Sequence, residues 1–172
     1  VNSPFGISIS HNGNLTNHQE LKDSLVKKDL RHLNTDSDSE VLLNVFAHEL
    51  QKQGSINPGS KEIFAAVKSL HKRVRGAYSV VIMINGVGIV GFRDPFGIRP
   101  LIVGSKERDL IGKDYMIASE STVLDSLGYE VIDDVMAGSA VFISSDGKME
   151  TESCINNHIP TPLSYTHLTL PT

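Results

Sequence analysis

The sequence has a single cysteine, no long apolar run and no excess of basic charge, and these absences exclude several classes of protein. One thiol, at Cys154, permits no internal disulfide, no Cys-x-x-Cys redox pair and no all-cysteine metal or iron–sulfur site. The longest apolar stretch, residues 80–84, is far below the roughly 18 residues of a membrane-spanning helix. No basic and then apolar leader follows Val1, so we expect a cytoplasmic protein, and a first residue other than Met suggests a fragment.

Charge and composition exclude further classes of protein. The 16 Lys and Arg residues stand against 20 Asp and Glu, and because they are spread along the chain we expect no nucleic-acid partner. The seven histidines show no ligand spacing such as His-x-x-x-His, so we predict no metal site. With 14 Gly and 7 Pro among 172 residues, the chain is neither collagen-like nor of low complexity and can form one core or slightly more.

The chain begins with a predicted strand and a predicted helix. Apolar residues alternate over residues 5–9, the period of a half-buried strand, and we expect this strand to end in a turn at residues 11–14. A helix follows, capped at residue 16 or 17. Leu21 and Leu25 lie four residues apart and form its apolar face.

Two more amphipathic helices are expected. The second begins at Ser37, because Ser37 and Glu40 have the spacing of a capping box, and we expect it to end at Gly54. The third follows a loop and is closed by Gly76. The apolar stripes of these helices are Leu42, Phe46 and Leu50, and Ile63, Val67, Leu70 and Val74.

In the second half of the chain the pattern changes to short β-branched runs. Asn-Gly at residues 85–86 is the strongest two-residue hairpin signal, so we expect residues 77–84 and 87–92 to pair antiparallel. A short helix is expected near residues 121–127. The further expected strands are residues 101–104, 115–118, 129–132 and 140–144, and an edge strand after residue 147. Because helices and strands are grouped and do not alternate, the sequence predicts an α+β fold with largely antiparallel sheets.

The pair Asn12-Gly13 is the first candidate for chemistry. Asn-Gly is a common hairpin turn, but a helix pattern follows it here, so a hairpin would have no second strand. A backbone N–H at Gly13 beside a side-chain amide at Asn12 would supply two neutral donors, as in an oxyanion hole. The residues alone leave a plain turn and an oxyanion hole both open.

Residues 36–40 (DSDSE) are the second candidate. They lack the glycine and the distal Glu of a calcium loop, so we expect no metal there. A helix start with an acidic first turn explains the pattern. An Asp at a helix N-terminus can in addition present its carboxylate to the ammonium group of a ligand.

Two other segments favour structural roles. Residues 93–101 (RDPFGIRPL) contain an Asp-Pro-x-Gly type I turn, which we interpret as a rigid turn with internally paired charges. The alternative is that Arg93 and Arg99 bind a phosphate. Residues 131–139 are similar to the ribose-phosphate loop of phosphoribosyltransferases, but they lack its Thr-Gly-Gly-Thr run and continue into a strand, so we expect no such site.

Five segments occur in a characteristic order: residues 11–17 (HNGNLTN), 34–40 (NTDSDSE), 75–78 (RGAY), 93–101 (RDPFGIRPL) and 118–121 (ASES). Together they resemble the glutaminase domain of the amidophosphoribosyltransferase family, the glutamine phosphoribosylpyrophosphate amidotransferases. The resemblance covers roughly residues 1–162. Glucosamine-6-phosphate synthase and asparagine synthetase resemble the chain only in part.

The resemblance implies a fold and a reaction. The fold is that of N-terminal nucleophile hydrolases, a four-layer αββα sandwich with antiparallel sheets, here truncated at its N-terminus. A cysteine thiolate at the mature N-terminus attacks the side-chain amide of glutamine, its own α-amino group shuttles the proton, and the thioester is hydrolysed to glutamate. Ammonia then reaches a separate transferase domain and displaces pyrophosphate from phosphoribosyl pyrophosphate, which yields 5-phosphoribosylamine in the first step of purine biosynthesis.

Matched residue by residue, the resemblance assigns three site residues. Asn12, through its side-chain amide, and Gly13, through its backbone N–H, match the oxyanion hole, and Asp38 matches the carboxylate that receives the α-ammonium group of glutamine. Glutamine and phosphoribosyl pyrophosphate are the expected ligands, and the full-length enzyme is expected to be a homo-oligomer. No cofactor is expected in this segment. Mg²⁺ is expected in the transferase domain, and an iron–sulfur cluster elsewhere in the enzyme is left open.

The sequence also departs from the family. Position 1 is Val and Cys154 lies far along the chain, so the nucleophile has no counterpart, and neither do the upstream arginine that binds the glutamine carboxylate and the transferase half. Residues 163–172 do not continue the family pattern, and we expect them to be a non-native, disordered tail. We therefore expect an inactive fragment of the enzyme. The alternatives are a pseudo-glutaminase that only binds, or another type-2 glutamine amidotransferase.

Overall fold

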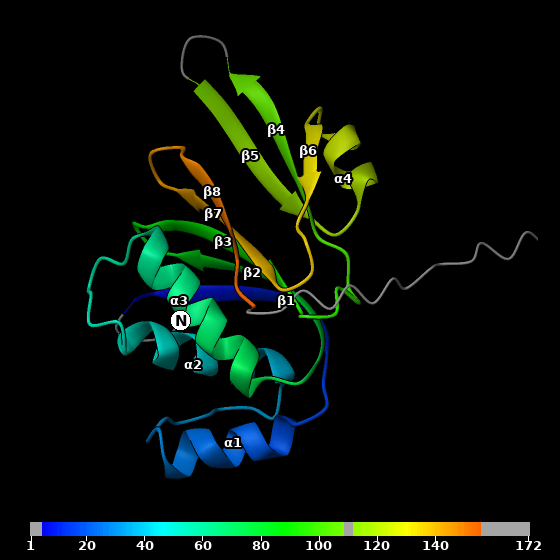
Figure 1. Ribbon diagram of the computed structural model, residues 1–172. Coiled ribbons are helices and arrows are strands. Elements are labelled where there is room, and N and C mark those ends of the chain that lie inside the picture. Colours follow the sequence, from blue (N-terminus) through cyan, green and yellow to red (C-terminus); the bar gives the residue numbers. More distant parts are fainter. Residues whose placement is uncertain (1–4, 109–111, 156–172) are drawn as a thin grey trace, which may run out of the picture.

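The computed structural model describes residues 5–108 and 112–155 (Figure 1). The expected tail at residues 163–172 lies outside these described residues. The elements, in chain order, are β1 (Ile7–Leu15), α1 (His18–Lys27), α2 (Asp38–Gln51), α3 (Ser60–Arg73), β2 (Gly76–Ile84), β3 (Gly88–Arg93), β4 (Ile102–Arg108), β5 (Gly112–Ala118), α4 (Ser121–Ser126), β6 (Glu130–Asp134), β7 (Ser139–Ser144) and β8 (Met149–Ser153).

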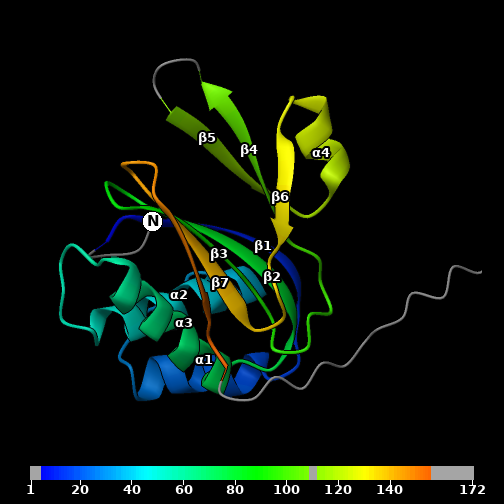
Figure 2. The same ribbon diagram turned by 45° about the horizontal axis from the view of Figure 1, so that its top comes forward.

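The strands form two sheets that are antiparallel throughout. The large sheet has the order β1-β2-β3-β7-β8, and the small sheet has the order β5-β4-β6. Helices α1, α2 and α3 cover one face of the large sheet, and the small sheet stands over its other face (Figures 1 and 2). Leu124 of α4 packs against Gly104, on the outer side of the small sheet. The layers therefore follow the order helix, sheet, sheet, helix, and the predicted α+β sandwich is confirmed.

Alternation along the strands divides the core into two parts. In β7, Ala140 and Phe142 belong to the core under the helices, whereas Val141 and Ile143 belong to a smaller core between the sheets. The expected apolar stripes of the helices are all buried in the first core: Leu21, Leu25, Leu42, Phe46, Leu50, Ile63, Val67, Leu70 and Val74. The predicted hairpin between β2 and β3 forms with the register Ile84↔Gly88.

The predicted turn at residues 11–14 is wrong, because β1 continues through them to Leu15 and pairs with β2 along its whole length. Gly13 makes this possible. It has φ = +146°, and a Cβ at this position would collide with the Ala77 carbonyl oxygen and lie 2.8 Å from the Tyr78 Cα. An L-residue would neither fit this approach nor favour this φ, so glycine lets the strand run past β2 without a break.

Two predicted helix ends are also displaced. Helix α2 ends at Gln51, before Gly54. Helix α3 ends at Arg73 with Val74 as its C-cap, and Gly76 opens β2 instead of closing the helix. Gly76 has φ = +142°, and a Cβ at this position would collide with the Asn14 carbonyl oxygen. The absence of a side chain therefore lets β2 pair closely with β1.

The segment 93–101 is a rigid turn, as expected, but its charges do not pair with each other. The Asp94 carboxylate is fully buried and accepts hydrogen bonds from the N–H groups of Phe96 (2.9 Å) and Ile98 (3.1 Å). Arg93 donates instead to three backbone carbonyls, those of Gly97, Arg99 and Val135, at 2.6–2.7 Å. Backbone N–H groups of the turn thus hold the Asp94 carboxylate, and backbone carbonyls of the turn and of Val135 hold the Arg93 guanidinium.

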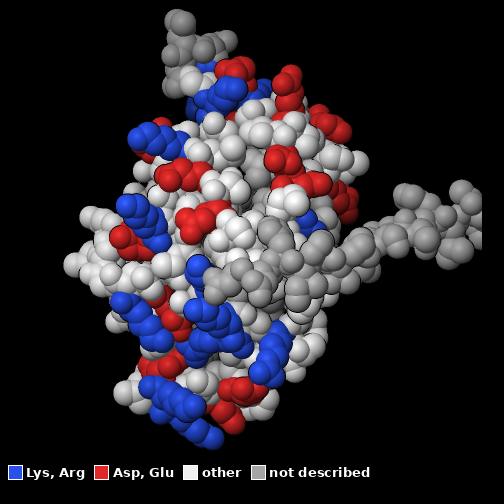
Figure 3. Space-filling view, in the orientation of Figure 1, with Lys and Arg blue, Asp and Glu red and all other residues white. Residues whose placement is uncertain are grey.

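No helix among the described residues has the length and apolar character needed to cross a membrane. Lys and Arg are interspersed with Asp and Glu over the face shown in Figure 3.

Candidate functional site

The backbone of Gly13 faces the open edge of the large sheet. Strand β1 is an edge strand, and Gly13 pairs with Tyr78 of β2. The Tyr78 carbonyl accepts from the Asp94 N–H at 2.8 Å and its own N–H donates to the Asp94 carboxylate at 3.2 Å, so both groups of Tyr78 point away from β1. In an antiparallel ladder the residue opposite then directs its N–H and C=O outward as well. The Gly13 N–H is therefore presented at the edge.

Asn12 is the residue that precedes this N–H along β1. Residues at even positions of β1 are exposed on the face opposite the helices, whereas Ile7 and Leu15 are buried beneath them. The Asn12 amide thus reaches solvent, and within the described part of the chain it has no hydrogen-bond partner. Two neutral donors from consecutive residues are available at one point of the sheet edge, the arrangement that an oxyanion hole requires.

Asp38 contacts the same edge two residues further along β1. It is the first residue of α2, and its Oδ2 accepts from the Leu15 N–H at 2.8 Å. Alternation of the ladder places the N–H groups of Gly13 and Leu15 on the same side, about 7 Å apart. The structure therefore places the Gly13 N–H and the Asp38 carboxylate along the same strand edge, and Asn12 is the residue before Gly13.

The second oxygen of Asp38 is also engaged. His18, the first residue of α1, places its Nδ1 2.6 Å from Asp38 Oδ1. His11 lies nearby, with its Nδ1 3.3 Å from the Ser39 hydroxyl; burial lowers the pKa of His11, and the Asp38 carboxylate partly opposes this shift. Sequence reasoning missed both histidines, because neither lies at a recognisable spacing from Asp38 and the contacts form only when β1, α1 and α2 pack together.

Glu40 orders the loop that leads into Asp38. Its carboxylate accepts from the N–H groups of Asn34 (2.8 Å) and Thr35 (2.6 Å) and from the Thr35 hydroxyl (2.6 Å). These hydrogen bonds lower its pKa to about 2. The predicted capping box is therefore only half correct: Ser37 caps the helix by accepting from the Ser39 N–H, but Glu40 bonds residues 34 and 35 instead of the cap.

The one cysteine lies far from this edge. Cys154 follows β8, at the opposite side of the large sheet, which is four strand spacings or roughly 19 Å away from β1. Its side chain is buried, and burial raises the pKa of its thiol to about 12. A thiol of this kind is neither accessible nor ionised near neutral pH, so it is not a nucleophile.

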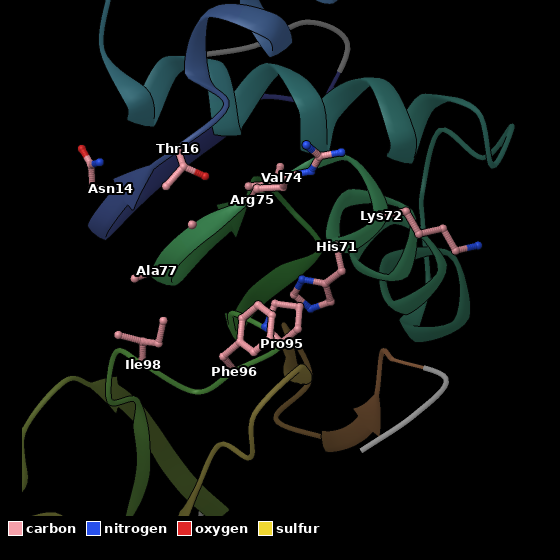
Figure 4. Close-up of a pocket in the computed structure, with 11 residues that line it drawn as sticks. Asn14, Thr16, His71, Lys72, Val74, Arg75, Ala77, Pro95, Phe96 and Ile98 are labelled. Carbon is pink, nitrogen blue, oxygen red and sulfur yellow. The ribbon is translucent and has the colours of Figure 1, made fainter. Parts of the chain in front are cut away.

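A cavity of about 710 Å³ adjoins the site (Figure 4). Asn14 lines it and leaves the same face of β1 as Asn12, while Pro95 and Phe96 line it from the rigid turn. Figure 4 shows the His71 ring beside Pro95 and Phe96. The His71 Nδ1 lies 2.9 Å from the Tyr78 hydroxyl, and burial lowers the pKa of His71 to about 4, so this ring is neutral.

The fold and this site define a class of protein. Residues 2–126 match the family described as glutamine amidotransferase domain, which is more than half of the chain. The chain therefore belongs to the glutamine amidotransferase domain family. Among the described residues, no three His, Cys, Asp or Glu side chains are grouped as metal ligands.

Curated relatives within this family are amidophosphoribosyltransferases. The chain is 51% identical to the protein of Pseudomonas aeruginosa, over 99% of this chain and 34% of the relative. It is 45% identical to that of Escherichia coli, over 98% of this chain and 33% of the relative. The chain thus spans about a third of the length of these relatives. The predicted resemblance to the glutaminase domain of this enzyme family is confirmed.

Solved structures agree with the fold. A glutamine phosphoribosylpyrophosphate amidotransferase from B. subtilis superposes with a TM-score of 0.70 at 29% identity, covering 92% of this chain and 31% of that one. A structure described as the allosteric regulatory enzyme of purine biosynthesis gives a TM-score of 0.69 at 28% identity, covering 91% and 30%. The expected N-terminal nucleophile hydrolase type of sandwich is confirmed.

Proposed function

We propose that this chain forms the larger part of the glutaminase domain of an amidophosphoribosyltransferase. The observation that carries the proposal is the placement of Asn12, Gly13 and Asp38 along one open strand edge, with the carboxylate tied to the Leu15 N–H at 2.8 Å. The curated relatives, which bear the name of this enzyme, support the same function.

In the proposed reaction, the Asn12 amide and the Gly13 N–H stabilise the negative charge that develops on the glutamine side-chain oxygen. A cysteine thiolate forms a bond to that carbonyl carbon, the C–N bond breaks, and ammonia leaves with the proton that the nucleophile's α-amino group returns. Water then cleaves the thioester to give glutamate. Asp38 receives the α-ammonium group of glutamine through its remaining lone pairs.

These 172 residues do not contain the nucleophile of this reaction. Their one thiol, Cys154, is buried and has a pKa of about 12. We therefore propose that the chain by itself binds the substrate amide without hydrolysing it. Transfer of ammonia to phosphoribosyl pyrophosphate, and any homo-oligomer, are likewise proposals for the whole enzyme.

The test is to assay the complete gene product for consumption of phosphoribosyl pyrophosphate with glutamine and with ammonia as the nitrogen source. We expect both reactions, and glutamate release only with glutamine. The 172-residue chain, assayed in parallel, should release no glutamate. A complete gene product that uses neither nitrogen source would refute the proposal.

A further inference from the structure

Strand β2 extends beyond the end of β3 at the candidate site. The last pair between the two strands is Ser79↔Arg93, after which the chain leaves the sheet and enters the rigid turn. Residues 76–78 of β2 therefore form an overhang that β3 does not reach. This overhang pairs with residues 13–15 of β1, which carry the backbone donors of the candidate site.

Asp94 takes the place of β3 at the overhang. Its N–H donates to the Tyr78 carbonyl at 2.8 Å, and its Oδ2 accepts from the Tyr78 N–H at 3.2 Å. In a regular antiparallel ladder the acceptor would be the carbonyl of residue 94, but this carbonyl accepts from the N–H groups of Gly97 (3.0 Å) and Gly138 (2.9 Å). The side chain thus completes a hydrogen-bonded pair for which the main chain is not available. Among the described residues, no other group bonds the backbone of the overhang on this side.

The Asp94 carboxylate is itself firmly held. It is fully buried, and its oxygens accept from the N–H groups of Phe96 at 2.9 Å and Ile98 at 3.1 Å. Another rotamer of this side chain would break several hydrogen bonds of a buried charge at once, which is costly. The turn therefore gives Tyr78 a rigid support.

Tyr78 transmits this support to Gly13. The two residues are directly opposite each other, and a Cβ on Gly13 would be only 2.8 Å from the Tyr78 Cα, so the two backbones are in close contact. Both backbone groups of Tyr78 are bonded to Asp94, so they do not compete for the Gly13 N–H. A displacement of the Tyr78 main chain would move the Gly13 N–H with it.

We propose that Asp94 is a positioning residue for the oxyanion hole, which holds Tyr78 and through it fixes the direction of the Gly13 N–H. The inference rests on the proposed function and extends it to a buried residue of the turn. Asp94 does not touch the substrate, so it acts on the chemical step through the placement of the donor. The Asp38 carboxylate belongs to α2, so binding of the α-ammonium group of the substrate depends little on Asp94.

The test is steady-state kinetics of the complete gene product with two variants at residue 94. Asp94→Asn keeps one acceptor oxygen, and Asp94→Ala removes both. We expect the glutamine-dependent kcat to fall about tenfold in Asp94→Asn and about a hundredfold in Asp94→Ala, the scale on which a misplacement of about 1 Å acts. The KM for glutamine should stay within about threefold of wild type, and ammonia-dependent synthesis should be unchanged.

Val90→Ala is the matched control for lost stability. Val90 is a fully buried residue of β3 and pairs with Ile82, away from the overhang. The variant should lower the melting temperature, because it leaves a cavity in the core, but its glutamine-dependent kcat should stay within about twofold of wild type at a temperature where the protein is folded. If Val90→Ala loses as much kcat as Asp94→Asn, residue 94 acts by general destabilisation and the positioning role is wrong.

Parallel measurement of Asn12→Ala separates the inference from the proposed function. If Asn12→Ala lowers the glutamine-dependent kcat and Asp94→Asn does not, the positioning role is wrong and the proposed function stands. If Asn12→Ala leaves this kcat unchanged, the oxyanion hole itself fails and Asp94 loses its role with it.

Amide hydrogen exchange of the complete gene product does not depend on activity. In Asp94→Asn, exchange over the overhang should become about tenfold faster, because its support on the side of β3 is weakened, whereas residues 80–84 of the same strand should exchange as in wild type. Unchanged exchange over the overhang, or equal acceleration along all of β2, would overturn the inference.

Discussion

The backbone N–H of Leu15 donates a hydrogen bond of 2.8 Å to the carboxylate of Asp38. The bond joins the end of β1 to the first turn of α2, 23 residues later in the chain. It places a half-buried negative charge beside the exposed backbone of Gly13. Both the position of the charge and its distance from the donors follow from this one contact.

Replacing Asp38 by Asn separates the charge from the hydrogen bond. The Asn oxygen can still accept from the Leu15 N–H, so the variant should fold with a melting temperature close to that of wild type. Without the negative charge, the KM for glutamine should rise about tenfold or more in the complete gene product. An unchanged KM in a folded Asp38→Asn variant would contradict the role of the carboxylate.

Gly13 should tolerate no side chain. Gly13→Ala adds a Cβ that collides with the Ala77 carbonyl oxygen at an unfavourable φ, and we expect the free energy of unfolding to fall by about 3 kcal/mol or more. Gly86→Ala is the matched control, because Gly86 also has a positive φ but nothing lies within 4 Å of its added Cβ. Gly86→Ala should lower the free energy of unfolding, measured with urea, by about 1 kcal/mol. Equal losses for the two variants would show that the close approach to β2 is not needed.

Arg73, the last residue of α3, joins α2 and the segment that follows α1 through two largely buried carboxylates. Its guanidinium lies 2.6 Å from Asp29 and 2.7 Å from Glu49, whose side chains are only 12% and 6% exposed. Arg73→Met would leave both acids without this partner, and we expect a loss of about 3 kcal/mol in unfolding free energy. The exposed pair of Arg108 and Asp114 is the comparison, and Arg108→Met should cost no more than about 0.5 kcal/mol. If Arg73→Met and Arg108→Met lower the free energy of unfolding by similar amounts, the buried ion pairs of Arg73 contribute no more to stability than an exposed pair.

Glu40 should make the free energy of unfolding depend on pH in the acidic range. Its hydrogen bonds lower the pKa from 4.5 to about 2, so the stabilisation is fully present above pH 4.5 and is lost as the pH falls to about 2. Glu40→Gln removes the titrating group. The difference in unfolding free energy between wild type and Glu40→Gln should therefore shrink on acidification through this range. A difference that stays constant with pH would show that the carboxylate is not held as described.

Local patterns predicted much of the fold because they report on one element at a time. The stripe of Leu42, Phe46 and Leu50 has the helical period, and all three residues are buried as expected. The two Asn-Gly pairs show the limit of such patterns. Residues 85–86 form the hairpin between β2 and β3, whereas Asn12-Gly13 lies inside a strand. Only the pairing of β1 with the distant β2 distinguishes the two.

The candidate site shows the same limit. Asn12, Gly13 and Asp38 could be selected from their motifs, and the structure brings them to one edge, while their roles stay predictions. The contact of His18 with Asp38 could not be predicted, because it depends on how α1 packs against the start of α2. The ring nitrogen reaches the carboxylate through tertiary structure, and no spacing in the sequence encodes that approach.

The oxyanion hole is the central claim, and Asn12→Ala tests it most directly. In the complete gene product, this variant should lose about 10²- to 10³-fold in glutamine-dependent kcat, because one of the two donors to the developing charge is removed. Its ammonia-dependent synthesis should remain at the wild-type level, since added ammonia does not need the glutaminase step. Equal loss of both activities, or no loss of the glutamine-dependent one, would contradict the account.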